Sequence, residues 1–245
     1  MAAFELAVQD PDGVAVAARI GADRVELCTA LAIGGVTPSA ALIESAVAVP
    51  LGPPVHVLVR PRGGGFTYDE AEVALTVRDA AHAVRLGAAG VVVGGVRDGR
   101  VDEELVRRVR DAVGGRPVTF HRAFDVLPEQ ERALEQLVAL GVRRVLTSGG
   151  ADAAGDALPR LAALAAIAGD RIEVMAGSGV RADLVPDLLA TGVHAVHASA
   201  KRLVEEGDGV ALGSASGPGR LMREVTDEAE ARRIAIAVRG AEASA

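Results

Sequence analysis

Eight short runs rich in β-branched and other apolar residues recur along this chain, and a stretch with helical periodicity follows each of them. The runs cover residues 4–8, 24–28, 55–60, 90–96, 118–122, 144–148, 172–177 and 195–199. Strands that alternate with helices pair in parallel, because the helix returns the chain to the same end of the sheet. Eight such units predict an α/β fold, a single TIM-like (β/α)8 barrel, whose functional residues lie at the C-terminal ends of the strands.

Glycine marks the ends of four predicted helices. Gly21, Gly87, Gly141 and Gly192 each stand shortly before a strand run. Because glycine readily adopts the left-handed conformation that stops a helix, the repeated joint predicts a repeated helix-to-strand turn. Helical periodicity covers residues 14–20, 39–47, 69–86, 102–113, 128–140, 157–168, 182–190 and 227–239.

The composition fits one domain over residues 1–245. Apolar residues make up 50% of the chain and aromatic residues 2%, so branched aliphatic side chains must fill the core, as they do in barrels. A net charge of −7 argues against nucleic-acid binding. Cys28 is the single cysteine, which excludes an internal disulfide. Since no signal peptide or membrane-spanning stretch is evident, we expect a cytoplasmic protein.

Two connections are longer than usual for a compact domain. Residues 60–66 follow the third strand, and residues 201–219 follow the eighth. The second connection is acidic at first and then rich in glycine and serine. Connections of this length are typically functional lids or lack order. We therefore expect residues 201–219 to form a flexible flap over the site.

Polar residues within the strand runs are the catalytic candidates, because a charge inside a barrel needs a partner or a ligand. These candidates are Glu5, Glu26, Arg60, His121, His197 and Ser199. The two carboxylates leave two explanations open. They serve acid–base or metal chemistry, or they form a structural network with buried arginine, for which Arg60 is the expected counter-ion.

Two pairs of residues at strand ends refine this set. Side chains alternate along a strand, so only one of His121 and Arg122 is expected to face the interior unless the chain turns there, and we favour His121. His197 and Ser199 share one face of the eighth strand. Two histidines and two carboxylates at one barrel mouth suit proton transfer or a divalent metal.

Two glycine-containing segments predict anion binding. The loop of Gly177, Ser178 and Gly179 offers backbone N–H groups where barrels often bind phosphate, and Thr147 and Ser148 repeat this chemistry one strand earlier. The alternative is that these glycines only form tight turns. A second anion contact is expected opposite, where Arg60 and Arg62 can clamp a carboxylate or phosphate.

Cys28 lies two residues after Glu26, on the same strand face. A single buried cysteine is more often a small apolar side chain than a metal ligand. A Cu(I) ion would need further sulfur donors, and Met175 is the candidate nearest the mouth.

The chain resembles the CutC family in six motifs that follow one another in order. They are GADRVELC (21–28), GGVTPS (34–39), RPRGGGF (60–66), TFHRAFD (119–125), RVLTSG (144–149) and MAGSGV (175–180). The resemblance implies a TIM-like barrel, a cytoplasmic homodimer and a role in copper homeostasis, with Cu(I) binding proposed for some members. Some relatives carry cysteines in the first strand, where this chain has none. The resemblance therefore implies weak Cu(I) binding at most, with Cys28 as the ligand.

Two functions follow as alternatives. The first is the copper homeostasis role that the resemblance implies. The second is a TIM-barrel enzyme of the isomerase or lyase type, acting on a small anionic or phosphorylated metabolite. In the second case Glu26 or His121 is the base, Arg60 the electrostatic clamp, and residues 177–179 the phosphate site.

Overall fold

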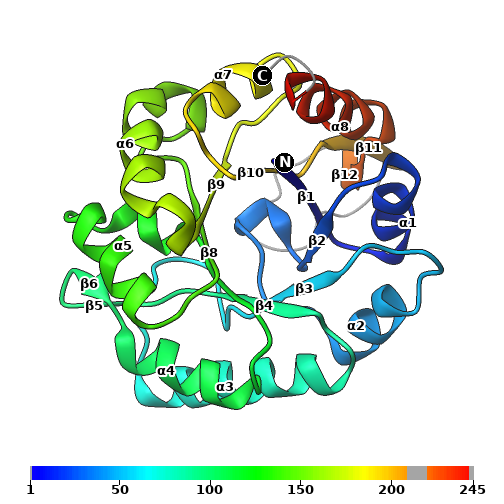
Figure 1. Cartoon of the computed structure of the whole chain (residues 1–245). Helices are drawn as coiled ribbons and strands as arrows, with labels where there is room; N and C mark the ends of the chain where they lie inside the picture. Colours follow the sequence, from blue (N-terminus) through cyan, green and yellow to red (C-terminus); the bar gives the residue numbers. More distant parts are fainter. Residues whose placement is uncertain (1, 209–219, 243–245) are drawn as a thin grey trace.

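The structure is a computed structural model that describes residues 2–208 and 220–242. Within these residues, eight parallel strands close into the barrel shown in Figure 1, in the ring order β1, β10, β9, β8, β7, β4, β3, β2. Their bounds are β1 (Ala3–Val8), β2 (Arg24–Leu27), β3 (Val55–Leu58), β4 (Gly90–Val93), β7 (Val118–Phe120), β8 (Arg144–Thr147), β9 (Glu173–Gly177) and β10 (Ala195–Ala198). The predicted barrel is confirmed, since each strand overlaps its predicted run.

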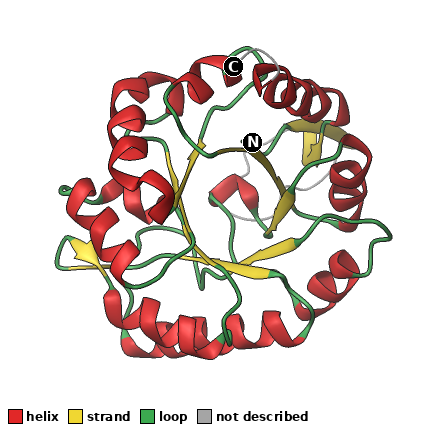
Figure 2. Cartoon of the chain, viewed as in Figure 1, coloured by secondary structure: helices red, strands yellow, loops and turns green. Residues whose placement is uncertain are grey.

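Helices surround the barrel on its outside (Figure 2). They are α1 (Pro11–Ile20), α2 (Ala40–Val47), α3 (Glu70–Arg85), α4 (Glu103–Ala112), α5 (Gln130–Ala139), α6 (Leu158–Ala168), α7 (Val185–Ala190) and α8 (Glu228–Glu242). The described residues also form four short 3-10 helices in the connections: η1 (Leu31–Ile33), η2 (Arg122–Val126), η3 (Ala154–Ala157) and η4 (Gly169–Arg171). None of the helices in the described ranges has both the length and the apolar character needed to cross a bilayer.

The helix ends follow the sequence signals. Asp10 accepts a hydrogen bond from the Gly13 N–H and caps α1, with Pro11 at its first position. Gly21, Gly87, Gly141 and Gly192 have φ values of 70°, 103°, 67° and 83°. The predicted left-handed joint is therefore present before all four strands.

Side chains along each strand point alternately to the apolar core between barrel and helices and to the interior of the barrel. Along β1, Leu6 and Val8 belong to the apolar core shared with the helices. Glu5 and Ala7 instead face the barrel axis, where Glu5 forms ion pairs and Ala7 lines a cavity. Because successive side chains point to opposite faces, the polar residues of the strands collect inside the ring.

Residues 201–208 differ from the expected loop. They form β11 (Lys201–Asp208), which pairs antiparallel with β12 (Arg220–Thr226). A second small hairpin joins β5 (Val96–Arg97) to β6 (Arg100–Val101). The β11 residues satisfy their backbone groups by this pairing, so low apolar content does not prevent order here. The rest of the predicted flap, residues 209–219, lies outside the described residues.

Candidate functional site

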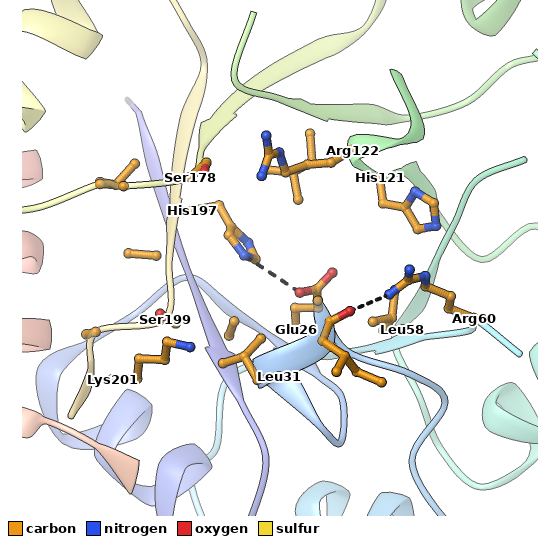
Figure 3. A pocket seen from close by; sticks show the side chains of 18 of the residues that line it. Glu26, Leu31, Leu58, Arg60, His121, Arg122, Ser178, His197, Ser199 and Lys201 are labelled. Atoms are coloured by element: carbon orange, nitrogen blue, oxygen red, sulfur yellow. Dashed lines mark hydrogen bonds and ion pairs between the residues drawn. The ribbon is translucent and has the colours of Figure 1, made fainter. Parts of the chain in front are cut away.

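A cavity of about 700 Å³ opens at the C-terminal ends of the barrel strands (Figure 3). Its apolar wall includes Leu31, Ile33, Leu58, Phe66, Leu146 and Val180. Its charged and polar wall includes Glu26, Arg60, His121, Arg122, Ser178, Arg181, His197, Ser199, Lys201 and Glu230. The cavity thus lies where a parallel barrel is expected to place its chemistry.

Glu26 projects from β2 into this cavity and is the most unusual charge in it. Its side chain is buried, and its Oε2 lies 3.6 Å from Nε2 of His197 (Figure 3). Within the described residues, Glu26 forms no ion pair with arginine or lysine. Burial raises the pKa of Glu26 to about 7, against the opposing charge of His197 and with the help of the Glu5 carboxylate. A carboxyl group of this kind can both accept and release a proton near neutral pH.

His197 is oriented from below by Glu5. Its Nδ1 lies 2.8 Å from Oε1 of Glu5, and the other oxygen of Glu5 accepts a hydrogen bond from Nε of Arg24 at 2.7 Å. Although burial opposes it, the hydrogen bond from His197 and the charge of Arg24 hold the pKa of Glu5 well below its ordinary value. Glu5 is therefore ionised, so the Nδ1–H of His197 donates to it.

The pKa of His197 is raised in turn. Burial acts against this rise, and the carboxylates of Glu26 and Glu5 outweigh it. Since burial raises the pKa of Glu26 as well, the protonation of the two neighbouring groups is coupled.

A polar layer fills the barrel below the cavity. Glu173 pairs with both Arg24 and Arg144, and Arg144 also donates to the Thr119 hydroxyl at 3.0 Å. The ion-pair network with buried arginine, one of the two alternatives that the sequence left open, therefore exists and includes Glu5. Glu26 stands outside it. The expected counter-ion was wrong, because Arg24 rather than Arg60 pairs with Glu5.

Arg60 is held by backbone carbonyl groups instead. Its guanidinium donates to the carbonyl oxygens of Ile33, Gly35 and Gly64 at 3.0, 2.9 and 2.7 Å. The expected clamp with Arg62 does not form, because Arg62 is exposed, pairs with Glu72 and does not line the cavity. Arg60 remains in the cavity wall as a cation without a carboxylate partner in the described part of the chain.

His121 and Arg122 both line the cavity, because the chain turns into η2 at Arg122. The ring Nδ1 of His121 accepts a hydrogen bond from the Ala123 N–H at 3.1 Å. Burial and the charge of Arg60 lower the pKa of His121 to about 3. The ring is therefore neutral, with its proton on Nε2. Arg122 pairs with Asp125 at 2.7 Å.

The predicted anion cradle at Thr147 and Ser148 is filled by the chain itself. The Thr147 hydroxyl and the Ser148 N–H both donate to the carboxylate of Asp125, as does the Gly150 N–H. Sequence reasoning missed Asp125, although it stands three residues after Arg122 in the TFHRAFD motif. An external anion would have to displace this carboxylate, so these two residues are not free to bind one.

The other predicted cradle is partly open. Ser178 and Gly179 line the cavity with φ values of 83° and 67°. Gly177 does not line it. A Cβ at Gly177 would lie 2.6 Å from Cδ1 of Leu146 and 3.3 Å from Cβ of His197, so this glycine makes room chiefly for Leu146 and also for the histidine. Ser199 lines the cavity as predicted.

The surroundings of Cys28 do not fit a copper site. Its side chain is fully buried against Leu58 and Val92, and its Sγ lies 3.7 Å from the Val8 carbonyl oxygen. Burial and the nearby Glu26 raise the pKa of the Cys28 thiol far above its ordinary value. Met175, the other expected sulfur donor, accepts a hydrogen bond from Arg24 in the polar layer rather than lying at the mouth. Across residues 2–208 and 220–242, no group of three or more His, Cys, Asp or Glu side chains is arranged to hold a metal ion.

Known proteins support the family that the motifs indicate. The model of the CutC family matches residues 2–202. A family protein CutC from Rhizobium meliloti is 44% identical over 214 residues, which cover 83% of this chain and 86% of the relative. One from Agrobacterium fabrum is 44% identical and covers 94% of this chain and 92% of its own.

A solved structure agrees with these sequence matches. It is named as the copper homeostasis protein CutC from Streptococcus agalactiae, and it shares 34% identity with a TM-score of 0.77 over 81% of this chain and 99% of its own. An aldolase named QR15, at 16% identity and a TM-score of 0.62, shares the fold alone. The chain therefore belongs to the CutC family.

Proposed function

We propose that this protein is an enzyme of the isomerase or lyase type that moves a proton next to a carbonyl group in a small anionic molecule. One observation carries the proposal. Glu26 is a buried carboxyl group in the wall of a 700 Å³ cavity, without an arginine or lysine partner in the described residues, and with its pKa raised to about 7. A structural carboxylate would be paired, whereas a general base needs a pKa near the working pH.

The neighbours of Glu26 have separate roles in this reaction. The Glu26 carboxylate takes the proton from the carbon beside the carbonyl, and the electron pair of that C–H bond moves to the carbonyl oxygen. His197, held by Glu5 through Nδ1, presents Nε2 toward Glu26 and can donate a proton to a developing oxyanion or leaving group. Glu26 then returns its proton to carbon in an isomerisation.

The charges of the cavity wall favour an anionic ligand. Four cations line the cavity, and three of them, Arg122, Arg181 and Lys201, pair with Asp125, Asp183 and Glu224. Arg60 is the cavity cation without a carboxylate partner in the described residues. An unpaired cation in the wall of a cleft attracts a ligand of the opposite sign.

Hydrogen exchange tests the proposal without a known substrate. The protein is incubated in D2O with a panel of small carbonyl compounds that carry a carboxylate or phosphate, and ¹H NMR follows the hydrogens next to the carbonyl. We expect exchange in at least one compound, slowed at least about 100-fold in Glu26→Gln. Glu135→Gln, on the exposed surface, serves as the matched control. Equal exchange in wild type and Glu26→Gln would contradict the proposal.

Copper homeostasis is the second candidate function, because the relative from S. agalactiae carries that name. The donor set around Cys28 argues against tight binding, since a Cu(I) thiolate would require deprotonation of a buried thiol. We expect weak Cu(I) binding in an anaerobic titration against a competing chelator, unchanged by Cys28→Ser. A tenfold or larger loss of affinity in Cys28→Ser would establish the cysteine as a ligand and favour the copper role.

A further inference from the structure

We infer that the anionic group of the ligand is a carboxylate, bound by Arg60 and His121 beneath a removable cap formed by Phe66. The inference rests on the proposed function, because it names the substrate class for the same cavity. It concerns the side of the cavity opposite His197, where Figure 3 shows Arg60 and His121 side by side.

Two buried N–H donors at this corner lack acceptors. Arg60 and His121 are each 5% exposed, and among the described residues neither Nε of Arg60 nor Nε2 of His121 has a partner within hydrogen-bonding geometry. The buried Tyr68 hydroxyl lies next to Arg60 and lacks such a partner as well. A buried donor without an acceptor costs about 1–3 kcal/mol, so such groups are rare and need an explanation. Here both N–H groups belong to side chains that line one cavity.

The charge at this corner is also unbalanced. The terminal nitrogens of Arg60 bind only carbonyl oxygens, which are dipoles rather than charges. His121 is neutral and supplies no negative charge. The corner therefore holds one positive charge that a ligand anion can neutralise in a buried setting, where such pairing is strong when the geometry is good.

The donors match a carboxylate better than a phosphate. Arg60 offers the Nε–H and the second N–H of the terminal nitrogen that binds Gly64, and His121 offers the Nε2–H, while the other guanidinium hydrogens are engaged by backbone. A phosphate dianion carries more oxygen acceptors and is usually bound by several charged or backbone donors. Three N–H donors and a single positive charge thus favour the smaller, singly charged anion.

Phe66 packs against both side chains. Its ring centroid lies 5.1 Å from that of His121, and Cζ of Arg60 lies 5.2 Å from it. Phe66 stands in the connection between β3 and α3, outside any helix or strand. A rotation of one side chain in this loop would open the corner without disturbing the barrel.

The surrounding backbone is shaped for this arrangement. A Cβ at Gly94 would lie 2.4 Å from Nδ1 of His121, and a Cβ at Gly34 would lie 3.2 Å from a terminal nitrogen of Arg60. Glycine at these two positions leaves space for the two side chains at the cavity wall.

Binding of pyruvate, compared with inorganic phosphate at equal ionic strength, tests the inference. Protein labelled with ¹⁵N in histidine is titrated, and the Nε2 resonance of His121 is followed by NMR. We expect pyruvate to shift this resonance and phosphate to leave it unchanged. A phosphate response as large as that of pyruvate would overturn the choice of carboxylate.

Variants of Arg60 and His121 test which side chains donate hydrogen bonds to the carboxylate. We expect Arg60→Lys to lower pyruvate affinity at least about tenfold, because a lysine cannot reproduce the Nε–H of the guanidinium. His121→Phe should lose a similar factor, and His121→Gln, whose amide can supply the same donor, should restore most of it. Unchanged affinity in both Arg60→Lys and His121→Phe would overturn the inference. Phe66→Ala should bind pyruvate at least as tightly as wild type, and a tenfold loss would contradict the cap.

Glu26→Gln separates this inference from the proposed function. Because Glu26 does not bind the carboxylate, this variant should bind pyruvate at least as tightly as wild type while losing hydrogen exchange. Exchange that depends on Glu26 but not on Arg60 would refute the subsite and leave the proposed function standing. Pyruvate binding that depends on Arg60, together with exchange unaffected by Glu26→Gln, would refute the proposed function alone.

Discussion

The carboxylate of Glu5 holds the imidazole of His197, with Oε1 2.8 Å from Nδ1, so that the opposite ring nitrogen faces Glu26 at 3.6 Å. Glu5 is fully buried and anchored by Arg24, which leaves it no freedom to turn away. The catalytic proposal therefore depends on a carboxylate that never contacts the cavity. Such an orienting partner fixes the tautomer of a histidine as well as its position.

Glu5→Gln should remove this anchor. We expect the free energy of unfolding to fall by about 3 kcal/mol, because a buried ion pair loses one partner. The pKa of His197 should also fall, since a neutral amide no longer stabilises the imidazolium. Chemical denaturation measures the first effect and histidine NMR the second. Glu135→Gln, in an exposed pair with Arg171, should change neither, and a His197 pKa unaltered in Glu5→Gln would show that Glu5 is not its electrostatic partner.

Glu26 should make stability depend on pH in a defined direction. Its pKa is raised from 4.5 to about 7, so the folded protein binds more protons than the unfolded chain between these values. The stabilising contribution of protonated Glu26 is complete below pH 4.5 and disappears as the pH rises through 7. The free energy of unfolding of wild type, relative to Glu26→Gln, should therefore fall by about 1–3 kcal/mol across this window. Urea titrations at several pH values measure it. A difference that does not change with pH would show an ordinary pKa of Glu26, and a difference that rises with pH would show a lowered one.

Gly94→Ala should disturb His121. The added Cβ would lie 2.4 Å from Nδ1 and 2.5 Å from Cε1 of the ring, which forces the ring to move and weakens its hydrogen bond with Ala123. We expect a loss of about 1–3 kcal/mol in unfolding free energy, typical of overpacking. Gly65→Ala is the matched control, because a Cβ there meets no atom within 4 Å. Equal stability of the two variants would mean that the ring adjusts without cost.

The thiol of Cys28 should not react in the folded protein. It is fully buried, and burial raises its pKa, so both access and thiolate are lacking. Labelling by a disulfide reagent should be slow under native conditions and become fast in denaturant, in step with unfolding followed by circular dichroism. Rapid labelling of the folded protein would reveal an accessible thiol and reopen the copper role.

Local sequence signals determined the barrel. The strand runs, the helical periodicity and the glycines after four helices act over a few residues, so their meaning does not depend on distant parts of the chain. Gly21 and Gly141 adopt the predicted left-handed conformation with φ values of 70° and 67°. The sequence also indicated that the polar strand residues would gather inside the barrel, because side chains alternate along a strand.

Only the tertiary structure decided which of these polar residues are paired. In the stagger of β1 against β2, Glu5 stands opposite Arg24, while Glu26 stands one pleat higher opposite Ala7. Strand register is a property of the closed ring and cannot be obtained from either strand alone. The register placed Glu5 in the ion-pair layer and left Glu26 facing the cavity.

The loops show the same difference between what the local sequence indicated and what the tertiary structure decided. The sequence placed a serine and glycine-rich turn after β8, and its composition predicted anion binding. The carboxylate that fills this turn comes from Asp125, on the preceding strand connection, and meets Thr147 and Ser148 only after the barrel has closed. Contacts between residues far apart in sequence depend on the whole fold. Local patterns therefore identified the candidate residues, and only the three-dimensional arrangement distinguished the occupied cradle from the open cavity.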